Sequence, residues 1–188
     1  RWDREERYTG KQVRDRITQI KTDTDVLVIS DYNKGVVTTN LIEWANIRGI
    51  KTFVDPKQSP ETYRHAWLVK PNLKEYEEWD GKFNPTKAAN LCRKHNWEWI
   101  IVTCGAEGIY AIHRDGESWH YKEPVREVAD VTGAGDCVMA VLVWGFTQGM
   151  SIPEAADVAW GHRHSSWAPA QPSWLYGPLE LSVRSEEH

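Results

Sequence analysis

Cysteine is scarce in this sequence of 188 residues, which has only Cys92, Cys104 and Cys137. Their number is odd and none forms a C-x-x-C pair, so the sequence indicates neither a disulfide framework nor a zinc site. The seven histidines also lack metal-ligand spacing, because His162 and His164 stand two residues apart. We expect the histidines to be solvated. This cysteine usage is typical of a reducing cytoplasm.

Long apolar runs and an excess of basic charge are missing as well. No stretch approaches the length of a membrane span, and residues 1–7 are too charged for a signal peptide. The net charge is −4 with acidic and basic residues intermixed, which leaves no basic stripe for a nucleic acid. We therefore expect a soluble, cytoplasmic protein that binds neither membranes nor nucleic acids. The length suits a single domain, residues 1–188.

Short β-rich segments alternate with helical patterns along the chain. The expected strands are 25–30, 52–54, 67–69 and 99–102, and the expected helices between them are 38–48, 73–79 and 85–95. Residues 109–112 and 119–121 flank Asp115-Gly116 as a hairpin, and helices follow from the glycine-rich segment to about 148 and from 153 to about 160. The alternation predicts an α/β fold with a mostly parallel sheet and flanking helices.

Polar residues stand where the expected parallel strands end. Asp31, Asp55, Asn72 and Thr103 each follow or close a strand. Ligands of open parallel sheets bind outside the carboxyl ends of the strands. The sequence therefore predicts that these four side chains gather at one edge of the sheet and form a site.

The segment 130–136, D-V-T-G-A-G-D, leads into an apolar helix. The backbone N–H groups of Gly133, Ala134 and Gly135 can surround an anion at the positive end of that helix. Asp136 falls in the first helical turn, where a carboxylate can take a proton from a hydroxyl group. This combination indicates phosphoryl transfer to an alcohol. The alternative is a helix with an acidic start after a glycine turn.

This segment resembles the signature of the ribokinase-like sugar kinases, the pfkB carbohydrate kinase family. Two further segments are similar to family motifs: 72–75, N-L-K-E, to N-x-x-E, and 103–108, T-C-G-A-E-G, to T-x-G-x-x-G. Within the family, the sequence is most similar to the D-glycero-β-D-manno-heptose-7-phosphate kinases of ADP-heptose synthesis. That similarity rests on the form of 130–136 and on two segments at 30–35 and 54–57, S-D-Y-N-K-G and V-D-P-K.

The resemblance implies a role for each matched residue, with ATP and Mg²⁺ as cofactors. Asp136 is the expected catalytic base, and 133–135 form the expected anion hole. Expected ligands of nucleotide, phosphates and Mg²⁺, the metal mostly through water, are Asp130, Asn72 and Glu75. Expected parts of the nucleotide pocket are Thr103, Gly105 and Gly108. Candidates for binding substrate or phosphate are Asp31, Lys34, Asp55 and Lys57. Each lysine could instead be an ordinary surface residue, and Glu75 a solvated residue of a first helical turn.

The resemblance also implies differences from the family. Residues 1–5 resemble the middle of the family domain, so we expect the first strands and the β lid over the sugar to be absent. The nucleotide side is expected at about 68–160, followed by a divergent tail at about 161–188. Trp160 stands where relatives have small residues beside the adenine.

We therefore expect ATP-dependent phosphoryl transfer to a sugar hydroxyl, with a heptose 7-phosphate as the acceptor. The alternative is a nucleotide-binding remnant or interaction module that has lost turnover. Besides ATP and the sugar phosphate, the expected partners are a second copy of the chain or a complementing polypeptide.

Overall fold

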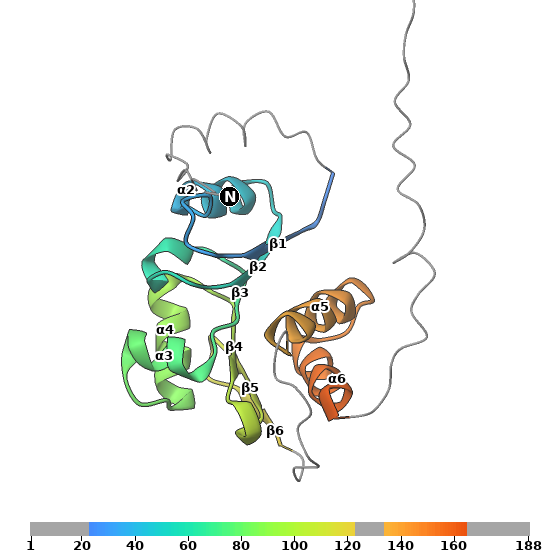
Figure 1. Ribbon diagram of the computed structural model, residues 1–188. Coiled ribbons are helices and arrows are strands. Elements are labelled where there is room, and N and C mark those ends of the chain that lie inside the picture. Colours follow the sequence, from blue (N-terminus) through green and yellow to red (C-terminus); the bar gives the residue numbers. More distant parts are fainter. Residues whose placement is uncertain (1–22, 123–133, 165–188) are drawn as a thin grey trace, which may run out of the picture.

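The computed structural model describes residues 23–122 and 134–164, which form one sheet with helices on both faces (Figure 1). The sheet has six strands in the order β1-β2-β3-β4-β5-β6. Four neighbouring strands run parallel: β1 (Val26–Ser30), β2 (Lys51–Asp55), β3 (Leu68–Val69) and β4 (Trp99–Thr103). The antiparallel strands β5 (Ile109–His113) and β6 (Ser118–Tyr121) complete it. The expected α/β fold with a mostly parallel sheet is confirmed.

The helices from the first part of the chain cover one face of the sheet, and the last two helices cover the other (Figure 1). One face carries α2 (Thr39–Ile47), α3 (Leu73–Asp80), α4 (Pro85–His95) and the short 3₁₀ helix η1 (Pro60–Tyr63). The other face carries α5 (Ala134–Thr147) and α6 (Ile152–His164), and the 3₁₀ helix η2 (Gly105–Glu107) follows β4. No helix within 23–122 or 134–164 is long and apolar enough to cross a membrane.

Successive residues of the central strands point to opposite faces, as the pleat of a strand requires. Val54, Val69 and Ile100 are buried in one cluster with side chains from α2, α3, α4 and η1. Phe53, Leu68 and Ile101 are buried against α5 and α6. This explains why neighbouring residues in the interiors of β2, β3 and β4 are all buried, without an alternation of buried and exposed positions. Since both faces are covered, the polar ends of these strands are left to build the site.

His95 corrects the expectation that all histidines are solvated. It is only 2% exposed, and its ring stacks on Trp97 with 5.1 Å between centroids. It lies in the last turn of α4, whose inner face also buries Ala88, Leu91 and Cys92, so helical spacing carries it into the core. Neither ring nitrogen has a hydrogen-bond partner within the described part of the chain. This burial lowers the pKa of His95 below its usual value.

Candidate active site

A cavity of about 590 Å³ opens at the carboxyl ends of the parallel strands, next to the first turn of α5. The strand register aligns Ser30 with Asp55, and a further bridge pairs Asn72 with Thr103. The predicted gathering of the strand-end residues at one edge is therefore present. Predicted site residues that line the cavity are Asp31, Asp55, Lys57, Asn72, Glu75, Thr103, Gly105, Gly135 and Asp136.

The remaining predicted residues are placed differently. Lys34 is exposed and does not line this cavity. Ala134 is the first residue of α5. Asp130 and Gly133 lie outside the described residues. Their expected roles in holding phosphates stay predictions.

Gly108 also stands apart from the cavity lining. It has a φ of +101°, and a Cβ atom there would meet the carbonyl oxygen of Tyr121 at 2.1 Å. Only glycine allows β6 to approach the chain this closely. The geometry thus gives Gly108 a packing role within the turn between β4 and β5.

A second hollow of about 670 Å³ adjoins the first, and Asn72, Thr103 and Gly105 border both. The second hollow extends over the start of α3, along Lys74 and Glu78. The two hollows are thus continuous across the end of β4. This continuity fits the expectation that Thr103 and Gly105 shape a nucleotide pocket.

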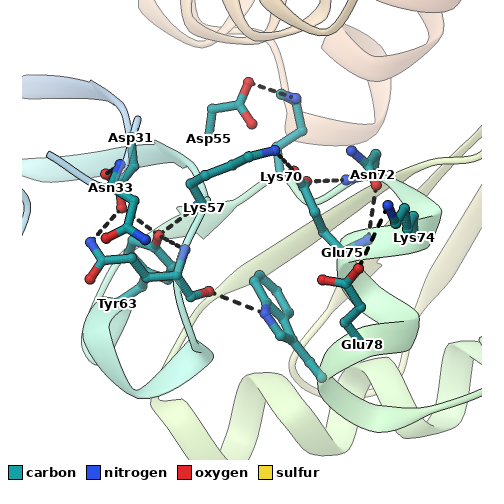
Figure 2. A network of polar contacts seen from close by, with 12 residues as sticks. Asp31, Asn33, Asp55, Lys57, Tyr63, Lys70, Asn72, Lys74, Glu75 and Glu78 are labelled. Atoms are coloured by element: carbon teal, nitrogen blue, oxygen red, sulfur yellow. Dashed lines mark hydrogen bonds and ion pairs between the residues drawn. The ribbon is translucent and has the colours of Figure 1, made fainter.

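The start of α3 is closed by its own side chains. Asn72 is the N-cap: its Oδ1 accepts a hydrogen bond from the Glu75 N–H at 2.9 Å, and Glu75 Oε2 accepts one from the Asn72 N–H at 3.0 Å. This reciprocal pair is a capping box. The other Glu75 oxygen, Oε1, lies 3.0 Å from the ammonium group of Lys57. Glu75 is thus held in place between the helix start and a lysine, rather than solvated (Figure 2).

Asp55 and Lys70 form a buried ion pair in the cavity wall, with 3.0 Å between Lys70 Nζ and Asp55 Oδ2. The Lys70 side chain is 3% exposed, and its ammonium group lies against α5, since a Cβ atom on Gly135 would be 3.4 Å from Nζ. Burial raises the pKa of Asp55, an effect that Lys70 opposes and that the Glu75 and Asp136 carboxylates add to. The end of β2, the ammonium group of Lys70 and the start of α5 thus lie next to one another.

Lys70 is the functional candidate that sequence reasoning missed. An ammonium group has three donors, and the described residues give Lys70 Nζ one acceptor, Asp55. The signal was present, because a charged residue directly follows the apolar run Trp67-Leu68-Val69 at a strand end.

Asp31 and Tyr63 form a second buried polar group beside the cavity. Asp31 is 6% exposed and Tyr63 is fully buried. The Tyr63 hydroxyl donates to Asp31 Oδ2 at 2.7 Å (Figure 2). Burial, helped by this hydrogen bond, raises the pKa of Tyr63, so the hydroxyl remains a donor at neutral pH. No sequence pattern pointed to Tyr63.

Metal binding at the cavity fits hydrated Mg²⁺ better than a cage of protein ligands. Its lining includes the carboxylates of Asp31, Asp55, Glu75 and Asp136 but the ammonium groups of only Lys57 and Lys70. Within 23–122 and 134–164, no cluster of three or more metal-binding side chains is preformed. Mg²⁺ commonly keeps several waters and takes one or two carboxylates together with substrate phosphates.

Comparison with known sequences identifies relatives along most of the chain. The chain is 36% identical over 170 residues to the bifunctional protein HldE of Shewanella sediminis, and 34% identical over 160 residues to that of Coxiella burnetii. These matches cover 85% and 81% of this chain, but only 36% and 34% of the relatives. The chain thus spans about a third of the length of the curated relatives it matches.

Solved structures support the same fold. A phosphofructokinase-2 mutant from Escherichia coli superposes with a TM-score of 0.69 at 19% identity, over 83% of this chain and 56% of the other. Arabidopsis thaliana ribokinase, solved with ribose and ATP, superposes with a TM-score of 0.64 at 15% identity, over 85% and 53%. At such identities the likeness shows the fold alone.

The family described as pfkB family carbohydrate kinase matches residues 13–166, which include all the described strands and helices. The resemblance first seen in short motifs therefore extends over most of the chain. This chain belongs to the pfkB family of carbohydrate kinases.

Proposed function

We propose that this chain carries the nucleotide-binding and catalytic part of an ATP-dependent sugar kinase, and that its acceptor is the anomeric hydroxyl of a heptose 7-phosphate. The observation that carries the proposal is the position of Asp136. It stands in the first turn of α5 and lines the same cavity as Lys70, Asp55 and Glu75. A carboxylate, a buried ammonium and a helix start meet there, which are the groups that phosphoryl transfer to an alcohol requires.

In this proposal Asp136 accepts the proton of the acceptor hydroxyl as its oxygen attacks the terminal phosphorus of ATP. The Lys70 ammonium and the backbone N–H groups at the start of α5 stabilise the charge on the transferring phosphoryl group. Asp55 holds Lys70 in place through the 3.0 Å ion pair. Asn72 and Glu75 would hold Mg²⁺, mostly through water, and the metal would neutralise phosphate charge when bound.

The heptose 7-phosphate is supported by sequence similarity. The segments 30–35, 54–57 and 130–136 resemble heptose-7-phosphate kinases, and the curated relatives are bifunctional HldE proteins. The cavity also presents Lys57 at its wall as a second cation for a sugar phosphate. A homodimer or a complementing polypeptide, and the division into a nucleotide side at about 68–160 and a tail, stay predictions.

The test is turnover by the purified chain and by Asp136→Asn, with ADP release measured on heptose 7-phosphate, fructose 6-phosphate and ribose. The amide keeps the shape of Asp136 but cannot accept the proton, so turnover should fall about 10²- to 10⁴-fold while the Kd for MgATP changes little. Cys137→Ser, in the same turn of α5 and equally exposed, is the matched control and should keep full activity.

Two results would count against this proposal. If Asp136→Asn kept turnover within a few-fold of the parent, Asp136 would not be the base. If the parent bound MgATP but turned over none of the acceptors, the nucleotide-binding module would be the better description of the chain.

A further inference from the structure

A single buried hydroxyl organises the segment that carries Lys57. Tyr63 Oη accepts hydrogen bonds from the backbone N–H groups of Lys57 and Gln58, each at 2.7 Å. The same hydroxyl donates to Asp31 Oδ2 at 2.7 Å. Tyr63 thus uses both the donor and the acceptor capacity of its oxygen, and the main chain at Lys57 is fixed from inside the core.

Both carboxylate oxygens of Asp31 accept hydrogen bonds from the protein. Its Oδ2 also accepts from Gln58 Nε2 at 2.7 Å, and its Oδ1 accepts from the Asn33 N–H at 2.7 Å. Both oxygens of a side chain that is 6% exposed are therefore occupied. This arrangement holds the loop after β1 against the loop after β2 and fixes the Asp31 carboxylate at the cavity wall.

Lys57 connects this buried group to the cavity. Its main chain is bound by Tyr63, and its ammonium group reaches Glu75 Oε1 at 3.0 Å, so its contacts continue into the capping box of α3 (Figure 2). The Lys57 side chain is 59% exposed, so its head also faces solvent at the cavity wall. The Lys57 ammonium group is therefore accessible to an anion that enters the cavity.

We propose that Tyr63 and Asp31 are positioning residues that fix the backbone at Lys57 so that its ammonium group binds a phosphate group in the cavity. The inference rests on the proposed function for the source of that phosphate, which is either the sugar phosphate or ATP. Lys57 is the contacting residue, and Tyr63 and Asp31 act through it. Glu75 holds the ammonium group until the phosphate arrives.

The first test needs no ligand and uses Tyr63→Phe in the full chain. Removal of the hydroxyl frees the backbone at 57–58, so Lys57 should leave Glu75. Because the hydrogen bond that Lys57 donates to Glu75 raises the pKa of Lys57, the loss of that bond should make the amine more reactive. Competitive acetylation followed by mass spectrometry should show faster modification of Lys57 relative to Lys74, an exposed internal reference.

Tyr76→Phe is the matched control. Tyr76 is also fully buried and its hydroxyl donates to Asp80 Oδ2 at 3.5 Å, and within the described residues it makes no hydrogen bond to Lys57. It should leave the Lys57 acetylation rate unchanged at a similar change in thermal stability. If Tyr63→Phe fails to fold, Asp31→Asn tests the same contact from the other side and should give the same increase in rate.

The second test is a double-mutant cycle on ligand affinity, with heptose 7-phosphate and MgATP titrated separately. Tyr63→Phe should weaken the ligand whose phosphate Lys57 binds about 3- to 10-fold, the effect of about one hydrogen bond, and should have no further effect in a Lys57→Ala background. The ligand that loses affinity identifies the source of the phosphate.

Equal acetylation rates in Tyr63→Phe and the parent, or an affinity loss that persists in the Lys57→Ala background, would overturn the inference. A chain without kinase turnover would instead contradict the proposed function. Acetylation of Lys57 would still decide the positioning role in that case.

Discussion

Two ion pairs lie on the walls of the same cavity, and they have equal lengths but different surroundings. Lys70 and Asp55 are 3.0 Å apart, with side chains 3% and 22% exposed. Lys57 and Glu75 are also 3.0 Å apart, but the Lys57 side chain is 59% exposed. A buried pair is costly to break, whereas an exposed pair contributes little to folding. We therefore expect the Lys70–Asp55 pair to stay intact in the folded chain, and the Lys57–Glu75 pair to break easily when a ligand binds.

The largest expected effect follows from breaking the buried pair. Lys70→Met should destabilise the chain by about 3 kcal/mol, because the Asp55 carboxylate is left without a partner in the cavity wall. Denaturant unfolding measures this change. Lys57→Ala, the exposed counterpart, should cost about 0.5 kcal/mol or less.

The cause of that loss can be checked with a second substitution. Asp55→Asn added to Lys70→Met removes the uncompensated charge and should restore much of the stability. If Lys57→Ala were as destabilising as Lys70→Met, the contrast between the two pairs would be wrong.

An intermediate effect is expected where Lys70 meets α5. A Cβ atom on Gly135 would lie 3.4 Å from Lys70 Nζ, which is ordinary contact, so Gly135→Ala should be tolerated. Gly135→Val adds two methyl groups that would displace the ammonium group from the phosphate position. We expect Gly135→Val to raise the Kd for MgATP about tenfold relative to Gly135→Ala, as measured by calorimetry, a loss of about 1.4 kcal/mol. Equal affinities would show that phosphate binds elsewhere.

The smallest expected effect is on the pH dependence of stability. His95 is buried without a hydrogen-bond partner among the described residues and His113 is paired with carboxylates, so their pKa values shift in opposite directions. Burial lowers the pKa of His95, so the unfolded chain binds the proton more readily, and stability falls as the pH drops below about 6.5. His113 is opposite in sign. Burial acts to lower the pKa of His113, but hydrogen bonds that its ring donates to the Asp115 and Glu98 carboxylates raise it. Its contribution to stability is therefore present at acidic pH and is lost as the pH rises.

Each histidine can be tested by its own substitution. His95→Leu should remove part of the acid-induced loss of thermal stability between pH 7 and pH 5, a range chosen around the usual histidine pKa of about 6.5. His113→Gln should increase that loss, because it deletes the pair that favours the protonated ring. Unfolding curves recorded at both pH values that do not differ between the variants would contradict these assignments.

The sequence predicted the fold well because the apolar runs at β2, β3 and β4 are short, continuous and separated by helical spacing. It also placed Asp55, Asn72 and Thr103 at one edge, since strand direction alone decides where strand ends meet. These features depend on local pattern and topology, which a single sequence contains.

The sequence did not predict which side chains would be bound to one another across that edge. Lys70 pairs with Asp55 of a neighbouring strand, and the Tyr63 hydroxyl is linked to Asp31 across 32 positions of the chain. The sequence predicted a solvated His95, but the position of this residue on the inner face of α4 packs its ring against Trp97. Such contacts depend on how distant segments pack, and neither spacing nor composition determines them. The roles of Asp130 and Gly133 stay predictions, because both lie outside the described residues.

The most direct test of the account is calorimetric titration of MgATP into the purified chain. We predict measurable heat with a Kd in the millimolar range or tighter, dependence on Mg²⁺, and loss of most of the affinity in Lys70→Met under conditions where that variant is folded. No heat and no displacement at millimolar ATP with Mg²⁺ would contradict the claim that this cavity is a nucleotide-binding site.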